Sequence, residues 1–196
     1  MENRHTWQTR PLTSDDIPAI ASIHQTELPD DFCAILGDRF LSALLYPGLL
    51  KVSDVALGTE QKGKLIAYVL FSQDEGFFSS LVFGNFWSFL SFVIPNLLKW
   101  RFLKYLLEVV LLVFKKDDRL KGHELAYIAV HKAYAGQGIG SELVRQSLAQ
   151  LREKGFEHAW VKTLASTPEN IRFYEKAGFE VLKTYLGRTY LTIRLH

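Results

Sequence analysis

Three glycines at alternate positions follow an apolar segment of the chain. The sequence AYIAV at residues 126–130 is followed by HKAYAGQGIG, which places Gly136, Gly138 and Gly140 at the start of a segment with helical spacing. The first turn of a helix has backbone N–H groups without intrahelical partners, and glycines leave these groups accessible. Such a turn is a favourable site for anions, and for phosphate groups in particular. The spacing therefore predicts a site for a phosphate-containing ligand.

Two common nucleotide-binding motifs do not fit this loop. The dinucleotide-binding fingerprint G-x-G-x-x-G needs a third glycine where the chain has Ser141. A P-loop needs Gly-Lys-Ser/Thr after four intervening residues, and no lysine stands there. The loop therefore indicates phosphate binding by another class of protein.

A second motif, TPENIRFYEKAGF, occupies residues 167–179. Thr167 suits a helix N-cap, Pro168 suits the first helical position, and Gly178 suits the end of the helix. This short helix carries Tyr174, whose phenol has an ordinary pKa of about 10 and can donate a proton. The alternative is that Tyr174 is an amphipathic core residue.

The two motifs resemble those of the GNAT superfamily of N-acyltransferases. The family pattern Arg/Gln-x-x-Gly-x-Gly/Ala is matched by residues 135–140, except that Ala135 stands where the family usually has Arg or Gln. The Tyr-x-x-x-Gly-Phe segment at residues 174–179 is similar to the closing element of the family, with Thr167 where many members have Asn. The order of elements follows the family along nearly the whole chain, apart from residues 77–121.

The resemblance implies an acyl-CoA ligand, with acetyl-CoA as the first expectation. In the family, the glycine loop holds the pyrophosphate of coenzyme A, and the preceding strand pairs with the pantetheine arm. Ala135 removes a side-chain contribution but keeps the backbone amides, so weakened pyrophosphate binding is expected. Carried over to this sequence, the cofactor-binding residues are Ile128, Ala129, Val130, Ala135, Gly136, Gln137, Gly138, Ile139, Gly140, Ser141 and Asn170.

Acyl transfer from a thioester to an amine requires a neutral amine, a polarised carbonyl, a stabilised oxyanion and a protonated thiolate leaving group. The resemblance implies that the backbone N–H of Val130 polarises the carbonyl and that Tyr174 protonates the thiolate. Some family members have a glutamate where Glu124 begins its strand, so Glu124 is a candidate general base. The alternatives are a solvated strand-entry residue and deprotonation through water.

Three acidic residues are candidates for binding the amine acceptor. Glu27, Asp30 and Asp31 follow the first predicted helix, which borders the acceptor slot in the family. The alternative is an ordinary solvated turn. We interpret His24 as a core histidine and Cys33 as a packed side chain. The six histidines and the single cysteine show no metal-ligand spacing, so no metal is expected.

The remaining pattern predicts an α/β fold with a single domain over residues 1–196, a length that suits one domain. The predicted strands are residues 6–12, 51–60, 63–73, 123–130, 156–164, 179–186 and 188–195. The predicted helices are residues 13–28, 32–46, 138–154 and 167–177. The resemblance implies that the mixed central sheet is splayed at the cofactor site and flanked by helices.

Residues 77–121 form an apolar insert that is longer than the usual family connection between two strands. No charged residue occurs from Gly76 to Leu98, a run that reaches the length of a membrane span. Polar residues, glycine and proline interrupt this run, and predicted strands of one sheet flank it, which argues against a span. Three interpretations stay open: helices packed over the core, a pocket for a hydrophobic acceptor or long acyl chain, and a surface at residues 77–114 for a membrane or a hydrophobic partner.

Charge and cysteine content exclude several classes of protein. The net charge of +2 is too small to indicate nucleic-acid binding, although residues 99–121 alone carry seven basic and three acidic side chains. With Cys33 as its single cysteine, the chain can form no intrachain disulfide, which suits a reducing compartment. The N-terminal MENRHTWQTR lacks the apolar core of a signal peptide, so a cytoplasmic location is expected.

The sequence therefore predicts an N-acyltransferase that moves an acetyl or other acyl group from acyl-CoA to a primary amine, most simply on a small molecule. The reaction implied is direct attack through a tetrahedral intermediate. Two alternatives stay open: a non-catalytic CoA-binding or sensing module, and a membrane-associated long-chain acyltransferase. A homodimer through the insert or the last strands is also left open.

Overall fold

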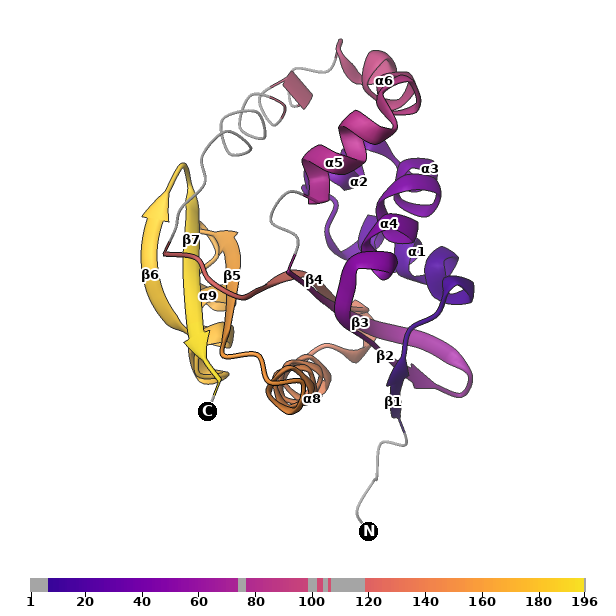
Figure 1. Cartoon of the computed structure of the whole chain (residues 1–196). Helices are drawn as coiled ribbons and strands as arrows, with labels where there is room; N and C mark the ends of the chain where they lie inside the picture. Colours follow the sequence, from indigo (N-terminus) through magenta and orange to yellow (C-terminus); the bar gives the residue numbers. More distant parts are fainter. Residues whose placement is uncertain (1–6, 74–76, 99–101, 104–105, 107–118, 196) are drawn as a thin grey trace.

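The computed structural model of the chain describes residues 7–73, 77–98, 102–103, 106 and 119–195. Within these residues, one seven-stranded sheet has the order β1-β2-β3-β4-β5-β7-β6, with helices packed on it (Figure 1). This arrangement confirms the predicted mixed α/β fold. The second half of the predicted insert contains basic and aromatic residues that lie outside the described residues, namely Lys99, Trp100, Arg101, Lys104, Lys115 and Lys116.

The strands of the sheet alternate with helices along most of the chain. The strands are β1 (Gln8–Pro11), β2 (Ser53–Gln61), β3 (Lys64–Ser72), β4 (His123–Val130), β5 (His158–Leu164), β6 (Glu180–Tyr185) and β7 (Arg188–Arg194). The longer helices are α1 (Ile17–Glu27), α2 (Phe32–Leu36), α4 (Tyr46–Val52), α5 (Phe77–Gly84), α6 (Phe86–Val93), α8 (Ile139–Glu153) and α9 (Pro168–Lys176). Every neighbouring pair of strands is antiparallel except β4 and β5, which are parallel.

The sheet opens between its two central strands. In the described structure, β4 and β5 pair at their first residues, His123 with Ala159 and Glu124 with Trp160, and then diverge (Figure 1). On the outer sides, β4 stays paired with β3 as far as Val130, and β5 stays paired with β7 along its whole length. The backbone of the inner side of β4 is therefore left without a neighbouring strand.

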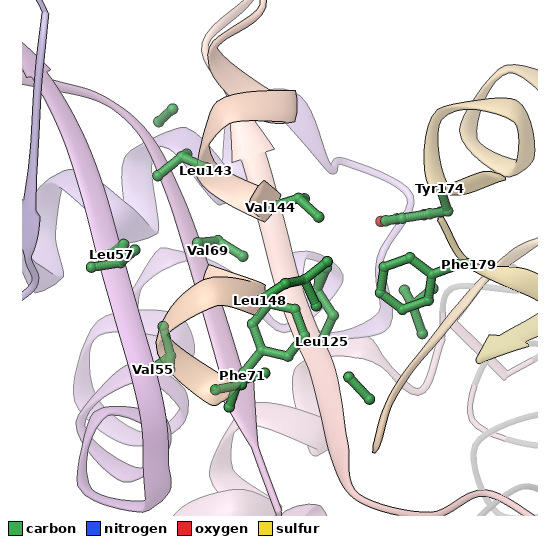
Figure 2. Close-up of a cluster of buried hydrophobic side chains, with 14 of the residues drawn as sticks. Val55, Leu57, Val69, Phe71, Leu125, Leu143, Val144, Leu148, Tyr174 and Phe179 are labelled. Atoms are coloured by element: carbon green, nitrogen blue, oxygen red, sulfur yellow. The ribbon is translucent and has the colours of Figure 1, made fainter. Parts of the chain in front are cut away.

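Helices cover both faces of the sheet, because each face of the central strands is apolar. On one face, α8 and α9 pack over β2 to β5, and Figure 2 shows side chains of α8 among those of β2, β3 and β4. On the other face, α1 to α6 bury a second cluster. Leu143 and Leu151 of α8 and Ile20 of α1 have no exposed surface. Full burial of such a side chain stabilises the fold by about 1.5–3 kcal/mol.

The single helix predicted over residues 32–46 is wrong. The structure has α2, the short helix α3 (Asp38–Phe40) and a π-helical turn at Leu41–Leu45 that leads into α4. Gly37 separates α2 from α3 with a φ of 97°, which lies outside the right-handed helical region. The helical periodicity of apolar residues persists across this break because the segments on both sides bury side chains in the same cluster.

The first part of the predicted insert forms two helices, α5 and α6, that pack partly on the core. Phe77 of α5 and Phe89 of α6 contact the cluster on the α1 face, as expected for helices that cover the core. The helices also expose Phe83 and Trp87 at 77% and 80%, and Leu98 in the turn after them is 98% exposed. Among the described helices, none is by itself long and apolar enough to cross a bilayer; α5 and the segment that begins with α6 reach that length and apolarity as a pair bent by 96°.

Candidate active site

The glycine loop forms an open approach to the N-terminus of α8. Gly136 and Gly138 have φ values of 75° and 83°, a left-handed conformation that favours glycine. A Cβ placed on either residue would meet no atom within 4 Å, so the surface of the loop is free on that side. Gly138 caps the helix without a side-chain hydrogen bond, which leaves first-turn N–H groups at the positive end of the helix dipole. This geometry fits a diphosphate.

Gly140 brings three elements together at this end of the molecule. A Cβ on Gly140 would lie 3.4 Å from Cγ2 of Val130 and 3.6 Å from the ring of Phe173. The start of α8 therefore lies against the end of β4 and against α9, which carries Phe173. A larger residue at this position would press on both elements.

The other predicted loop residues differ in their surroundings. The backbone N–H of Ala135 donates to the carbonyl of Lys132 at 3.1 Å, so it already has a partner. Ser141 is exposed and Gln137 is half-buried, while Ile139 is buried in the core cluster. The loop's capacity for anions therefore lies in its backbone after Gly136.

Backbone groups of β4 face the gap in the sheet. The N–H of His131 donates to the carbonyl of Ile66 at 2.8 Å, and hydrogen-bonded and non-bonded pairs alternate along an antiparallel ladder. It follows that Val130 and Ile128 point their N–H and C=O groups away from β3, toward the gap. Ala129 has the opposite orientation: its backbone pairs with β3, and its side chain is buried in the α1-side cluster.

Tyr174 extends from α9 toward α8. Figure 2 shows its ring beside Phe179, with the hydroxyl directed to the side on which Val144 of α8 lies. The side chain is buried, and no described residue forms a hydrogen bond with the hydroxyl. Burial raises the pKa of the Tyr174 phenol above its ordinary value. The hydroxyl is therefore protonated across the physiological range and not bound to another residue of the described structure.

Glu124 is in an ion pair rather than in water. Its Oε1 lies 2.7 Å from Nζ of Lys162 on β5, and its side chain is 17% exposed. Burial lowers the pKa of Lys162, but the carboxylate of Glu124 offsets this, so the pKa is raised overall. The pair joins β4 and β5 at the point where the strands begin to diverge.

The three predicted acceptor-binding residues have different surroundings. Glu27 accepts a hydrogen bond of 3.0 Å from the backbone N–H of Lys132, which ties α1 to the turn after β4. Asp30 is exposed. Asp31 accepts from the N–H of Cys33 at 2.8 Å, where it caps α2. Asp31 is therefore part of a structured cap and not of a simple solvated turn.

A buried polar network behind Asp31 was not predicted. Nε2 of His24 lies 3.3 Å from Oδ2 of Asp31, and Nδ1 of His24 is bonded to the hydroxyl of Tyr46 at 2.5 Å. That hydroxyl is in turn 2.5 Å from the hydroxyl of Tyr68. Burial alone raises the pKa of Asp31, but the interaction with His24 lowers it overall. His24 is a core histidine as interpreted, but it also connects Asp31 to the interior.

Two further predictions concern Asn170 and metals. Nδ2 of Asn170 donates to Oγ1 of Thr163 at 3.4 Å, so this side chain is turned toward the end of β5. In the part of the chain that the structure describes, no group of three or more His, Cys, Asp or Glu residues is placed to hold a metal ion. The hollow lined by Leu12, Gln150 and Lys154 lies at the C-terminal end of α8, away from the glycine loop, and belongs to no feature of this site.

Comparison with known proteins identifies the family. The sequence matches the Acetyltransferase (GNAT) family over residues 17–179. The chain belongs to this family. The resemblance seen in the two motifs is therefore confirmed.

Curated relatives of this GNAT protein match it over short regions. It is 37% identical over 57 residues to the uncharacterized N-acetyltransferase YjgM of Escherichia coli (strain K12). The aligned region covers 29% of this chain and 34% of YjgM. It is 35% identical over 69 residues to the tRNA(Met) cytidine acetyltransferase TmcA of Pyrococcus furiosus. The aligned region covers 35% of this chain and 8% of TmcA. The chain thus spans about a third or less of the length of these two relatives.

Solved structures resemble this GNAT protein over almost its whole length. SsHAT has a TM-score of 0.69 at 19% identity, with 97% of this chain and 98% of SsHAT covered. The ribosomal-protein-S18-alanine N-acetyltransferase from Escherichia coli has a TM-score of 0.63 at 16% identity, with 97% and 94% covered. YncA from Salmonella typhimurium, solved with its cofactor acetyl-CoA, has a TM-score of 0.57 at 18% identity, with 97% and 94% covered. At these identities the similarity shows a shared fold.

Proposed function

We propose that this protein transfers an acetyl group from acetyl-CoA directly to a primary amine, most simply on a small molecule. One observation carries the proposal: the open N-terminus of α8, the free backbone edge of β4 and the hydroxyl-bearing helix α9 meet around Gly140, which lies against Val130 and Phe173. An acyl transferase needs an anion site, a donor to a carbonyl and a proton donor within the length of one ligand. The YncA structure, solved with acetyl-CoA, supports the choice of donor.

Backbone groups would hold the coenzyme. The first-turn N–H groups of α8 and the loop after Gly136 would bind its pyrophosphate, and the free N–H and C=O groups of Ile128 would pair with its pantetheine arm. When bound, acetyl-CoA supplies an activated acyl group as a thioester. Because Ala135 offers no side-chain contact, affinity would rest on these backbone groups.

Two groups of the chain would act on the reacting atoms. The N–H of Val130, which faces the gap, would donate to the carbonyl oxygen and stabilise the negative charge that develops there. The Tyr174 hydroxyl would give its proton to the sulfur as the C–S bond breaks and the C–N bond forms. An oxygen of Glu124 already pairs with Lys162, and protonating it would break that ion pair. We therefore assign removal of the amine proton to water.

The test compares acyl-CoA donors in binding and in turnover. Acetyl-CoA at a hundred times its Kd is expected to raise the free energy of unfolding by about 2.7 kcal/mol. Palmitoyl-CoA at the same concentration is expected to stabilise less, and a panel of primary amines is expected to release free coenzyme A from acetyl-CoA. Stabilisation without turnover of any amine in the panel would contradict the proposed enzyme and support a CoA-binding module.

A second candidate function is favoured by the exposed surface of α5, α6 and the turn that follows them. Phe83, Trp87 and Leu98 present large apolar side chains to solvent, and exposed apolar patches mark sites of interaction. A membrane-associated enzyme that uses long acyl chains would have such a surface. It predicts the reverse result in the same comparison, with palmitoyl-CoA preferred over acetyl-CoA.

A further inference from the structure

Arg188 at the start of β7 has a buried Nε for which the described chain provides no hydrogen-bond partner. It lies opposite Leu164, the last residue of β5, in the ladder that joins these strands. A buried donor on a charged group is costly to leave without a partner. Such an atom in a folded protein needs an explanation, and a ligand that completes the hydrogen bond provides one.

A second cation lies on the same face of the sheet. Lys162 is two positions before Leu164 on β5, and residues two apart on a strand share a face. Its side chain is 40% exposed, although its Nζ lies 2.7 Å from Glu124 on β4. Burial lowers the pKa of Lys162 and the charge of Arg188 adds to this, but Glu124 raises the pKa overall. The two cations therefore lie on one face of the sheet, on paired strands.

A carboxylate lies on the same side of the sheet, where Oδ2 of Asp31 is 3.5 Å from the hydroxyl of Tyr127 on β4. Asp31 lies in the segment before α2, and its side chain is 28% exposed. Burial is the largest single influence and raises its pKa, but His24, the N–H of Cys33 and the charge of Arg188 together lower the pKa overall. The segment before α2 and the strands β5 and β7 therefore place Asp31, Lys162 and Arg188 on one side of the sheet, beside the diverging ends of β4 and β5.

We propose that these three side chains bind the acceptor and that the acceptor is an amino acid, in which a carboxylate lies next to the primary amine. Arg188 and Lys162 bind the carboxylate, and Asp31 holds the amino group at the gap in the sheet. A guanidinium binds a carboxylate through short, charge-assisted hydrogen bonds. The inference rests on the proposed function, since these side chains serve an acceptor only if the thioester lies in that gap.

Amines without a neighbouring carboxylate would leave the site incomplete. An amino sugar, a diamine or a protein N-terminus supplies the amine but no anion next to it, so Nε of Arg188 would stay unpaired. A site built to bind a polar group discriminates strongly against analogues that lack it. The structure therefore favours free amino acids over these other acceptors.

Matched acceptors test this inference. For several side chains, kcat/KM with acetyl-CoA is measured for the amino acid, its amide and its decarboxylated amine. We expect the amino acid to be preferred by about 10- to 100-fold, the range of a lost charge-assisted hydrogen bond. Binding of the amino acid to protein mixed with coenzyme A is measured by calorimetry, which provides a readout without turnover.

The variant Arg188→Gln is expected to raise KM for the amino acid by about tenfold or more and to reduce its preference over the decarboxylated amine by a similar factor. Arg188→Lys should restore part of the preference, because it keeps the charge. Arg194→Gln is the matched control, since Arg194 is an exposed arginine on the same strand, at its far end. If Arg188→Gln does not fold, Lys162→Gln provides the same comparison.

Three outcomes would overturn the inference. Equal use of the amino acid, amide and amine by the unaltered protein would contradict it, and so would an unchanged preference in Arg188→Gln. Absence of calorimetric binding by any amino acid would also contradict it. In each case acetyl-CoA binding and turnover of other amines would still support the proposed function, whereas loss of acetyl-CoA binding itself would contradict both.

Discussion

Replacing Tyr174 by phenylalanine is expected to lower kcat for acetyl transfer by about 100-fold or more, the range of a lost general acid. The Kd for acetyl-CoA should stay within about twofold, because the proposed pyrophosphate and pantetheine sites are backbone groups of α8 and β4. Phenylalanine keeps the ring contacts with Phe173 and Phe179, so the core should hold. The measurements are steady-state kinetics and calorimetric titration with acetyl-CoA.

Burial disfavours the charged form of both groups in the proton transfer, the phenolate of Tyr174 and the thiolate of the leaving group. The pKa of Tyr174 is raised because the charged phenolate is poorly solvated. A thiolate leaving group in the same cleft would be poorly solvated for the same reason, so the proton transfer keeps its driving force. The phenol stays protonated through neutral and mildly alkaline pH. Deprotonation of Tyr174 should therefore cause no loss of kcat below a pH of about 10.

Tyr134→Phe is the matched control for this variant. Tyr134 packs against the same core cluster and is half-buried, but it lies on the turn before the glycine loop and not on α9. Removal of its hydroxyl should leave kcat within about twofold. If Tyr174→Phe retained the kcat of the unaltered protein, Tyr174 would be a core residue and the proposed acid would be wrong.

Replacing Gly138 by valine is expected to raise the Kd for acetyl-CoA by about tenfold or more, which corresponds to about 1.4 kcal/mol. The Cβ of residue 138 would point into the open space where the pyrophosphate is proposed to bind. Valine also disfavours the φ of 83° that starts α8, so the first-turn N–H groups would be displaced. Calorimetry with acetyl-CoA measures the change.

Gly63→Val separates the loss of the site from backbone strain. Gly63 lies in the turn between β2 and β3, has a φ of 73° and has no atom within 4 Å of a Cβ. Both substitutions should therefore destabilise the fold by a similar amount, about 1–2 kcal/mol. Gly138→Val alone should weaken acetyl-CoA binding. An equal effect on Kd in the two variants would show that the glycine loop is not the coenzyme site.

Signals contained in a short stretch of chain were readable from the sequence. Gly136 and Gly138 before an amphipathic segment, and Thr167 to Gly178 around a short helix, predicted their elements because caps and turns depend on a few neighbouring residues. The break at Gly37 was missed because a glycine inside an apolar helical pattern is often tolerated without ending the helix.

The polar surroundings of the site could not be read in the same way. His24, Tyr46 and Tyr68 lie on separate elements that only the folded sheet brings together. Arg188 comes near Lys162 because β7 pairs with β5, ahead of β6 in the sheet order. A lysine within the otherwise uncharged strand HAWVKTL was the one local sign of this cluster. Spacing along the chain carries no information on such contacts.

The structure of the protein with acetyl-CoA tests the central claim most directly. We expect the pyrophosphate within hydrogen-bond distance of the first-turn N–H groups of α8, the thioester carbonyl at the N–H of Val130 and the sulfur within reach of the Tyr174 hydroxyl. A pyrophosphate bound at any other surface, or a sulfur that Tyr174 cannot contact, would contradict this account of the enzyme.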